Sequence, residues 1–247
     1  MNVEGKMVEV QASDGAMPVY LATPQGEGPF PGVIVVMEAF GLNHHIKDVC
    51  ERIAREGYVV ASPDLYYRSP GERVCAYTEL PKAIQLMMDL PGYDAIVADV
   101  RATIDLLEAQ PAIEPGRIGM TGFCMGGFVT FLAACRLPII AAAPFYGGGI
   151  GRNMMPSERR PHPPIDEAAG ITASMLVFYG DQDTFIPPDE VALVKERLAA
   201  LGKDAQVIVY PGADHGFFCD ERPSYHEAAA QDSWRKLLRL FETKLRK

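Results

Sequence analysis

Residues 122–127 read Gly-Phe-Cys-Met-Gly-Gly and place Cys124 in a G-x-C-x-G pattern. The strand-like run 117–120 precedes this hexamer, and a stretch typical of a helix follows it. In a strand-to-helix elbow, small residues flank the nucleophile because the backbone turns too sharply for a neighbouring Cβ, and the nucleophilic side chain is left exposed. A thiol loses its proton far more easily than a hydroxyl, with a reference pKa of about 8.5. The hexamer therefore predicts a nucleophile whose reactivity depends on control of a thiolate.

Length and composition favour a single domain over residues 1–247. The 247 residues exceed the loose guide of about 150 per domain, but α/β folds often reach this size as one unit. A hydrophobic content of 48% is ample for a core. With 23 Lys and Arg against 32 Asp and Glu, the net charge of −9 argues against nucleic acid or an anionic membrane as the main partner. Small molecules and proteins remain as partner classes.

The ends and the cysteines of the chain indicate a cytoplasmic protein. Residues 1–10 lack the apolar core of a secretory signal, and the weakly polar stretch 137–150 is broken by prolines and glycines, so it is not a membrane span. The five cysteines are scattered without C-x-x-C spacing. This pattern favours reduced thiols over a disulfide framework or a zinc site. We expect no cofactor and no metal, and the oligomeric state is left open.

Strand-like runs alternate with helix-like segments, which predicts a mostly parallel central sheet with helices on both faces. Residues 33–37 and 58–61 are typical of strands buried on both faces. An opening antiparallel pair is expected at 8–11 and 19–22, with further strands at 117–120, 139–143, 175–179 and 206–210. Apolar spacing predicts helices within 96–107 and 191–201 and from about residue 224 onward. The Gly- and Pro-rich segment 147–168 is long for a loop, so it is a lid or pocket wall, or else a plain solvated loop.

Two residues downstream of the hexamer can complete a nucleophilic site. Asp183 lies in Gly-Asp-Gln-Asp-Thr-Phe-Ile-Pro at 180–187, directly after an expected strand, and His215 lies in Gly-Ala-Asp-His-Gly-Phe at 212–217, after the next one. The order nucleophile, acid, base is that of an α/β-hydrolase triad. The imidazole takes the thiol proton while the carboxylate fixes its tautomer. Taken singly, these residues are ordinary packing and turn formers, so their joint order carries the prediction. Asp181 competes for the role of the acid.

Five ordered motifs resemble the dienelactone hydrolase (carboxymethylenebutenolidase) family. They are the hexamer, the segments at 183–187 and 214–217, Glu-Ala-Phe-Gly-Leu-Asn at 38–43, and Ser-Pro-Asp-Leu-Tyr at 62–66. The likeness runs through nearly the whole chain. It implies an α/β-hydrolase fold without a large cap domain, and a triad of Cys124, His215 and Asp183.

The same resemblance implies a role for Glu38. In such enzymes a glutamate after the strand that matches 33–37 lies beside the resting thiol, and substrate binding rearranges the pair so that the cysteine ionises. An anionic neighbour disfavours a thiolate and suppresses oxidation. The alternative is a carboxylate that caps loop amides. The backbone N–H groups of Met125 and Ala39 are expected to form the oxyanion hole.

The sequence is less informative about the substrate. Family members that cleave dienelactone are expected to hold its carboxylate with arginines, one of them a few residues after the histidine, where this chain has Cys219. A thiol cannot replace the bidentate contact of an arginine. Candidate replacements are Arg68, Arg73, Arg152, Arg159 and Arg160, and candidate pocket aromatics are Phe40, Tyr66, Tyr67, Tyr146 and Phe217, for which ordinary core packing is the alternative. The adjacent His44 and His45 invite a metal site, but helix-start surface histidines are the favoured interpretation because neighbouring residues point in different directions.

These features predict a cofactor-free hydrolase that cleaves an ester, an (enol-)lactone or a thioester through a cysteinyl acyl-enzyme. The first alternative is a non-catalytic small-molecule receptor or regulator on a hydrolase scaffold. The second is a redox role for the reactive thiol. A complete triad favours the enzyme, because a binding module has no need of all three groups.

Overall fold

The computed structural model describes residues 1–153 and 156–246. In this part of the chain one eight-stranded sheet has the order β1-β2-β4-β3-β5-β6-β7-β8. Its strands are β1 (Val3–Ala12), β2 (Gly15–Pro24), β3 (Phe30–Val36), β4 (Val59–Pro63), β5 (Ile113–Phe123), β6 (Ala141–Phe145), β7 (Ser174–Gly180) and β8 (Ala205–Tyr210). β1 and β2 pair antiparallel, as do β2 and β4, whereas the pairs from β4 to β8 are parallel. The mostly parallel sheet matches the prediction, although β1, β2 and β5 are longer than expected.

The burial of each strand follows its place in the sheet. Every residue of β3, β4 and β6 is buried, because helices cover both faces of the central parallel strands. The edge strand β1 instead alternates, with Val8 and Val10 partly buried and their neighbours exposed. The parallel register aligns the carboxyl ends of β3, β5 and β6, so that the loops which follow these strands emerge at one edge of the sheet. That edge is where the predicted site residues are expected to meet.

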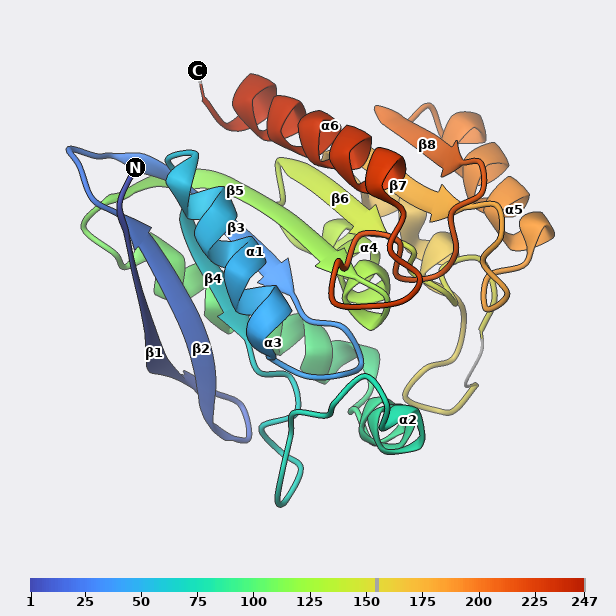
Figure 1. Cartoon of the computed structure of the whole chain (residues 1–247), viewed down its shortest axis with the longest axis horizontal. Helices are drawn as coiled ribbons and strands as arrows, with labels where there is room; N and C mark the ends of the chain where they lie inside the picture. The colour runs from blue at the N-terminus through green and yellow to red at the C-terminus, as the bar shows by residue number, and fades with distance from the viewer. Residues whose placement is uncertain (154–155, 247) are drawn as a thin grey trace.

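Helices cover the sheet on two sides (Figure 1). One side holds α1 (His44–Arg55) and α6 (Glu227–Leu245), and the other holds α3 (Tyr93–Glu108) and α4 (Met125–Arg136), with α5 (Pro188–Ala200) over β8. The final helix begins at Glu227 rather than near 224, because a turn precedes it and the His226 imidazole caps it by accepting from the Ala229 N–H at 3.3 Å. None of the helices in the described residues is long and apolar enough to cross a membrane.

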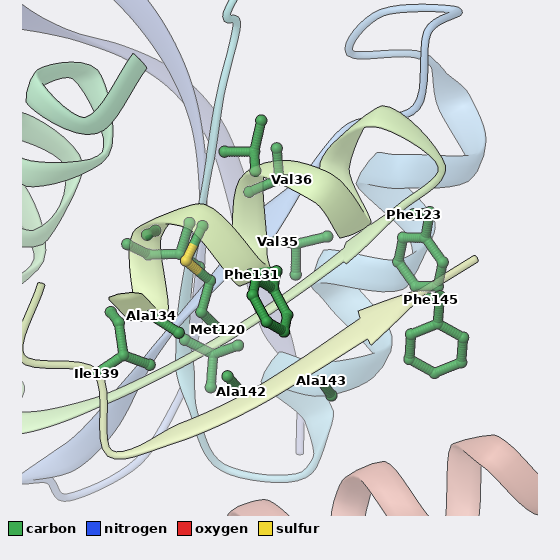
Figure 2. Packing of buried hydrophobic residues seen from close by; sticks show 14 of the residues in the cluster. Val35, Val36, Met120, Phe123, Phe131, Ala134, Ile139, Ala142, Ala143 and Phe145 are labelled. Atoms are coloured by element: carbon green, nitrogen blue, oxygen red, sulfur yellow. The ribbon is translucent and has the colours of Figure 1, made fainter. Parts of the chain in front are cut away.

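The core that supports the site fills both faces of the central strands, since the Met120 and Ala142 side chains lie under α4 whereas the Phe123 and Phe145 rings pack against Phe218 on the opposite face. Figure 2 shows Phe131 of α4 turned toward the sheet residues Met120 and Ala142, with Phe123 and Phe145 further along the strands. The Phe123 and Phe145 ring centroids lie 4.8 Å apart, and all five side chains are inaccessible to solvent. Phe123 directly precedes Cys124, so this packing anchors the start of the elbow.

Two segments near the carboxyl edge differ from expectation. Helix α2 (Leu80–Met88) has no counterpart in the sequence prediction, because it is only nine residues long and carries Pro81 in its first turn, and it buries only Ala83. The segment 147–168 ends within a 3₁₀ helix, η1 (Pro164–Gly170), and the buried Glu190 carboxylate accepts from the N–H groups of Gly149 and Gly151 at 2.8 and 3.1 Å. Residues 154–155 of this expected lid or pocket wall lie outside the described residues.

Candidate active site

The turn between β5 and α4 holds Cys124 in a backbone conformation that few side-chain-bearing residues adopt. Its φ is 54° and its ψ is −116°, outside the regions favoured by L-residues. A Cβ atom at Gly122 would lie 2.3 Å from the carbonyl oxygen of Gly126, and one at Gly126 would lie 2.3 Å from that of Val36. Close backbone packing therefore requires these glycines, and the packed neighbours hold the strained cysteine in place.

Cys124 differs from the other cysteines in its exposure. It is partly exposed, whereas the other four are buried. Burial raises the pKa of the Cys135 and Cys219 thiols to about 12, which keeps them protonated at neutral pH. Cys124 occupies the N-cap position of α4, and its N–H donates to the Phe145 carbonyl at 3.0 Å. The partial positive charge of a helix N-terminus favours an anion at this position, so the site suits a thiolate.

Asp183 and His215 meet at the ends of β7 and β8. The His215 Nδ1–H donates to Asp183 Oδ2 at 2.8 Å, and Asp183 Oδ1 accepts from the backbone N–H groups of Phe185 and Ile186 at 2.9 and 3.2 Å. The carboxylate is thus fixed from both sides. Asp181, the competing acid, is exposed and accepts from the Gly212 N–H at 2.7 Å, so it shapes a turn instead.

The imidazole of His215 also connects to the nucleophile. Burial lowers the pKa of His215, but the charge of Cys124 and the hydrogen bonds of the imidazole with Asp183 and Cys124 raise it overall to about 10. A raised pKa favours the imidazolium, which is the state that pairs with a thiolate. With Nδ1 directed at Asp183, the other ring nitrogen is the one left for the thiol. The structure therefore brings Cys124, His215 and Asp183 together as a hydrogen-bonded chain.

Two backbone amides near Cys124, those of Ala39 and Met125, have no acceptor among the turn, loop and cap hydrogen bonds of the described residues. Met125 is the first residue of α4, where helix N–H groups have no intrahelical acceptor. Ala39 lies in the turn after β3, and Cys124 packs against the small apolar cluster to which Ala39 belongs. These positions suit an oxyanion hole.

Glu38 lies two residues after the end of β3, and its side chain is fully buried. Its Oε1 lies 3.4 Å from Arg222 Nη1 and 3.5 Å from the Tyr146 hydroxyl. Its Oε2 is buried and has no hydrogen-bond partner among the residues described. The resemblance implied a glutamate beside the resting thiol. Among those same residues no hydrogen bond joins Glu38 to Cys124, and the carboxylate is paired with Arg222 while the thiol is paired with His215.

Arg222 is a site residue that the sequence reasoning missed. Its guanidinium carbon lies 5.4 Å from the centre of the Phe40 ring and 5.6 Å from that of Tyr77. Burial lowers the pKa of Arg222, but the charge of Glu38, together with smaller contributions from its other neighbours, raises this pKa overall. The loop after His215 folds back, and a Cβ at Gly216, where φ is +81°, would lie 2.2 Å from Arg222 Nη1. An arginine therefore reaches the site from a position seven residues after the histidine, in place of the fourth.

Comparison with known proteins identifies the family that shares this arrangement. The model of the dienelactone hydrolase family matches residues 17–245. The chain belongs to the dienelactone hydrolase family. The resemblance drawn from the sequence motifs is confirmed.

Relatives of this family member extend over almost the whole chain. It is 39% identical over 228 residues to a "putative carboxymethylenebutenolidase" of Synechocystis sp., which covers 92% of each protein. A "putative dienelactone hydrolase" from Klebsiella pneumoniae superposes with a TM-score of 0.89 at 35% identity, covering 98% of this chain and 99% of the other. A "dienelactone hydrolase-like promiscuous" phosphotriesterase, P91, from metagenomic libraries superposes with a TM-score of 0.81 at 25% identity, covering 99% of both. The α/β-hydrolase fold is thereby confirmed, no large cap domain interrupts the described residues, and the protein is an enzyme of the carboxylic ester hydrolase class.

In this dienelactone hydrolase family member, the side chains of four of the five arginines proposed from sequence have partners other than the triad. Arg68 pairs with Asp99 at 2.6 Å and with Asp14 at 2.5 Å, and Arg73 pairs with Asp64 at 3.2 Å. Arg152 pairs with Asp189, and Arg160 donates to the Leu90 and Pro91 carbonyls. For Arg159 the contact is made by the backbone, whose carbonyl accepts from the Tyr93 N–H at 3.2 Å. Arg222, by contrast, acts electrostatically on both Glu38 and Cys124.

The aromatic residues form the surroundings of the triad. The ring of Tyr146 lies 5.2 Å from those of His215 and Phe217, and Phe40 packs edge-on against Tyr77 at 4.8 Å. Phe40, Tyr66, Tyr146 and Phe217 are all buried, whereas Tyr67 is partly exposed and its hydroxyl bonds to Asp99. Phe185 was not predicted to contribute, yet its ring lies 5.2 Å from the His215 ring and is 54% exposed.

The adjacent histidines diverge, as their positions on a helix start require. His44 is exposed and pairs with Glu221 at 2.8 Å. His45 is not at the surface as expected, because its ring is buried against Phe123 and Phe218, and burial lowers its pKa. Within the described residues no group of three or more His, Cys, Asp or Glu side chains is arranged to hold a metal.

Proposed function

We propose that this enzyme cleaves the acyl–oxygen bond of an ester or enol-lactone through a cysteinyl acyl-enzyme. The observation that carries the proposal is the hydrogen-bonded chain from Cys124 through His215 to Asp183 at a strained elbow. A nucleophile, a base and a carboxylate that orients the base are the groups that covalent acyl transfer requires.

The proposed reaction uses each group in turn. The Cys124 thiolate attacks the carbonyl carbon, and the carbonyl oxygen gains the electron pair while the N–H groups of Ala39 and Met125 stabilise it. Collapse of this intermediate breaks the acyl–oxygen bond, and the departing alkoxide or enolate takes the proton of the His215 imidazolium. Neutral His215 then removes a proton from water, which attacks the thioester and releases the acid. Asp183 keeps the imidazole in the required tautomer throughout.

Glu38 and Arg222 have opposite effects on the nucleophile in this proposal. Arg222 favours a nearby thiolate and Glu38 disfavours it. Because the two are paired, their opposite effects on the Cys124 thiolate partly cancel. Glu38 thereby restrains the reactivity of the thiol, and a partly neutralised Arg222 remains available to a substrate carboxylate.

The surroundings of Cys124 favour a compact, apolar or conjugated acyl group. Cys124 packs against a cluster formed by Ala39, Phe40, Cys75 and Ala83. An apolar wall with Arg222 beside its Phe40 ring suits a small lactone or aryl ester that carries a carboxylate. The physiological substrate is proposed only at this level of chemical class.

The test compares the purified enzyme with Cys124→Ala and His215→Ala on enol-lactones, aryl esters and thioesters. An aryl phosphotriester belongs in this panel because the P91 relative is described as a phosphotriesterase. Cys135→Ala is the matched control, since this buried thiol lies near the opposite end of α4 from Cys124. We expect loss of turnover in the first two variants, retention in the control, and an acyl adduct on Cys124 detected by mass spectrometry after an acid quench. Undiminished turnover by Cys124→Ala excludes the mechanism.

The same panel separates the alternatives. A non-catalytic receptor would bind compounds without turnover by the unmodified chain, and a thioesterase would prefer thioesters to oxygen esters. The receptor is disfavoured because Asp183 and His215 are held in a geometry that binding alone does not require.

A further inference from the structure

Tyr66 contacts both residues whose amides form the proposed oxyanion hole. Its hydroxyl donates to the Ala39 carbonyl at 3.0 Å and lies 3.4 Å from the Met125 sulfur. The side chain is 1% exposed, so it is shielded from a substrate. The carbonyl oxygen is the stronger acceptor, and the sulfur is a packing neighbour of the same hydroxyl. Tyr66 therefore bridges the turn after β3 and the first residue of α4.

Hydrogen bonds to residues close to it in the chain hold the backbone of Tyr66 in place. Its backbone N–H donates to Asp64 Oδ1 at 3.0 Å, and Asp64 is held in turn by Arg73 at 3.2 Å. The Tyr66 carbonyl accepts from the Ser69 N–H at 2.8 Å. Burial raises the pKa of Tyr66 above its ordinary value, with further contributions from Cys124, Cys75 and Asp64, so the phenol keeps its proton. The hydroxyl is thus a rigid and permanent donor.

The turn that carries Ala39 relies on this donor. The Gly41 N–H donates to the Glu38 carbonyl at 3.1 Å, and the Cys75 N–H donates to the Phe40 carbonyl at 3.0 Å. The Ala39 carbonyl, between these two, is held by the Tyr66 hydroxyl. Because the carbonyl and the N–H of one residue are linked through a single φ and ψ pair, fixing the carbonyl restricts the direction of the N–H.

We propose that Tyr66 is a positioning residue of the oxyanion hole, which aims the Ala39 N–H at the carbonyl oxygen of the substrate during attack by Cys124. This inference rests on the proposed function. The sequence analysis expected Tyr66 to line the substrate pocket, whereas in this proposal Tyr66 lies behind the pocket and holds the oxyanion hole in place.

The chemistry offers a way to isolate this role. Acylation by an ester creates an oxyanion, and a donor is effective only within about 2.7–3.1 Å of that oxygen. Alkylation of the same thiolate by iodoacetamide displaces iodide at a carbon atom and creates no oxyanion. Loss of the Tyr66 hydroxyl should therefore slow acylation and spare alkylation.

The test is Tyr66→Phe, with Tyr67→Phe as the matched control. Tyr67 is the adjacent residue, and its hydroxyl bonds to Asp99 at 3.1 Å, outside the triad. We expect Tyr66→Phe to lower kcat for p-nitrophenyl acetate by about 10- to 100-fold, because misalignment costs less than the removal of a donor. KM and the alkylation rate of Cys124 should stay within about twofold, and the control should change neither rate by more than about twofold.

Two further variants keep the inference falsifiable. Ala39→Pro removes the N–H itself at the second position of the turn, where proline is favoured. Adding Tyr66→Phe to Ala39→Pro should then cost less than about twofold more. If Tyr66→Phe does not fold, Arg73→Ala weakens the same anchor through Asp64 from a partly exposed position, and should also slow acylation selectively.

Three results would overturn the inference: equal losses of acylation and alkylation, independent losses in the double variant, or an acylation rate that no variant changes. The failure of the proposed function is recognised separately. In that case Cys124→Ala retains full turnover, or the unmodified enzyme forms no acyl adduct at Cys124.

Discussion

Replacing Asp183 by asparagine should remove most of the activity while leaving the fold intact. The Oδ1 atom of Asp183 accepts from two backbone N–H groups, those of Phe185 and Ile186, and Oδ2 accepts from His215. An asparagine must keep its carbonyl oxygen toward the two backbone donors, because its NH₂ group cannot accept a hydrogen bond. The NH₂ group then faces His215 Nδ1 and donates to it. The imidazole proton is forced onto the nitrogen nearest Cys124, where it blocks uptake of the thiol proton.

The expected loss in kcat is about 10³- to 10⁴-fold, the effect of a wrong tautomer in such a triad. This corresponds to about 4 to 5 kcal/mol of activation free energy. Burial lowers the pKa of His215, but Cys124 and Asp183 raise it overall to about 10. This pKa should fall in the variant, because the contributions of Asp183 are lost. The descending limb of kcat/KM against pH should therefore move from about pH 10 to lower pH.

The assay is steady-state hydrolysis of p-nitrophenyl acetate across pH, beside Asp181→Asn as the control. Asp181 accepts a hydrogen bond from the Gly212 N–H, and an asparagine oxygen can replace that acceptor. The control should keep its activity within about threefold. Retention of more than about a tenth of the activity by Asp183→Asn, or an equal loss in Asp181→Asn, would refute the assignment of Asp183 as the residue that orients the base.

Two further predictions concern the neighbours of the nucleophile. Glu38→Gln removes the charge that faces Arg222, so we expect the free energy of unfolding, measured in urea, to fall by about 1–3 kcal/mol. We also expect iodoacetamide to alkylate Cys124 faster at pH 6, because the anionic neighbour is gone. Slower alkylation would contradict the restraining role of Glu38. Gly122→Ala places a Cβ 2.3 Å from the Gly126 carbonyl oxygen, so we expect the free energy of unfolding to fall by more than about 3 kcal/mol. In the control Gly71→Ala, where the space is open and φ is +85°, it should fall by about 1 kcal/mol. Equal losses would show that the elbow tolerates a side chain.

Much of the fold was predictable because its signals are local. The parallel strands were located from short apolar runs, and the elbow from glycines whose spacing reflects contacts within a few residues. Helix α2 was missed because its nine residues form a short segment with a proline in the first turn, where the helical signal is weak, and in the fold it buries a single side chain. His45 was misjudged for the related reason that burial at a helix start depends on Phe123 and Phe218 of other elements.

The site divides in the same way. Residue types in order along the chain indicated Cys124, Asp183 and His215, whose relative placement follows from strands that end at one edge. The resemblance placed the arginine at the position of Cys219, and the prediction failed there because the spacing after a histidine is informative only if the loop follows the same path. In this structure the loop folds back at Gly216 and brings in Arg222.

The sequence by itself determined which chemical groups are present and the order in which they follow the strands, since strand periodicity and the glycine elbow are encoded over short stretches. Only the tertiary structure decided which of these groups act on one another. Glu38 and Arg222 are 184 positions apart, and Tyr66 and Ala39 are 27 apart. Whether such groups meet depends on the paths of loops packed at the carboxyl edge of the sheet, and long-range packing of this kind leaves no periodic signal in the sequence.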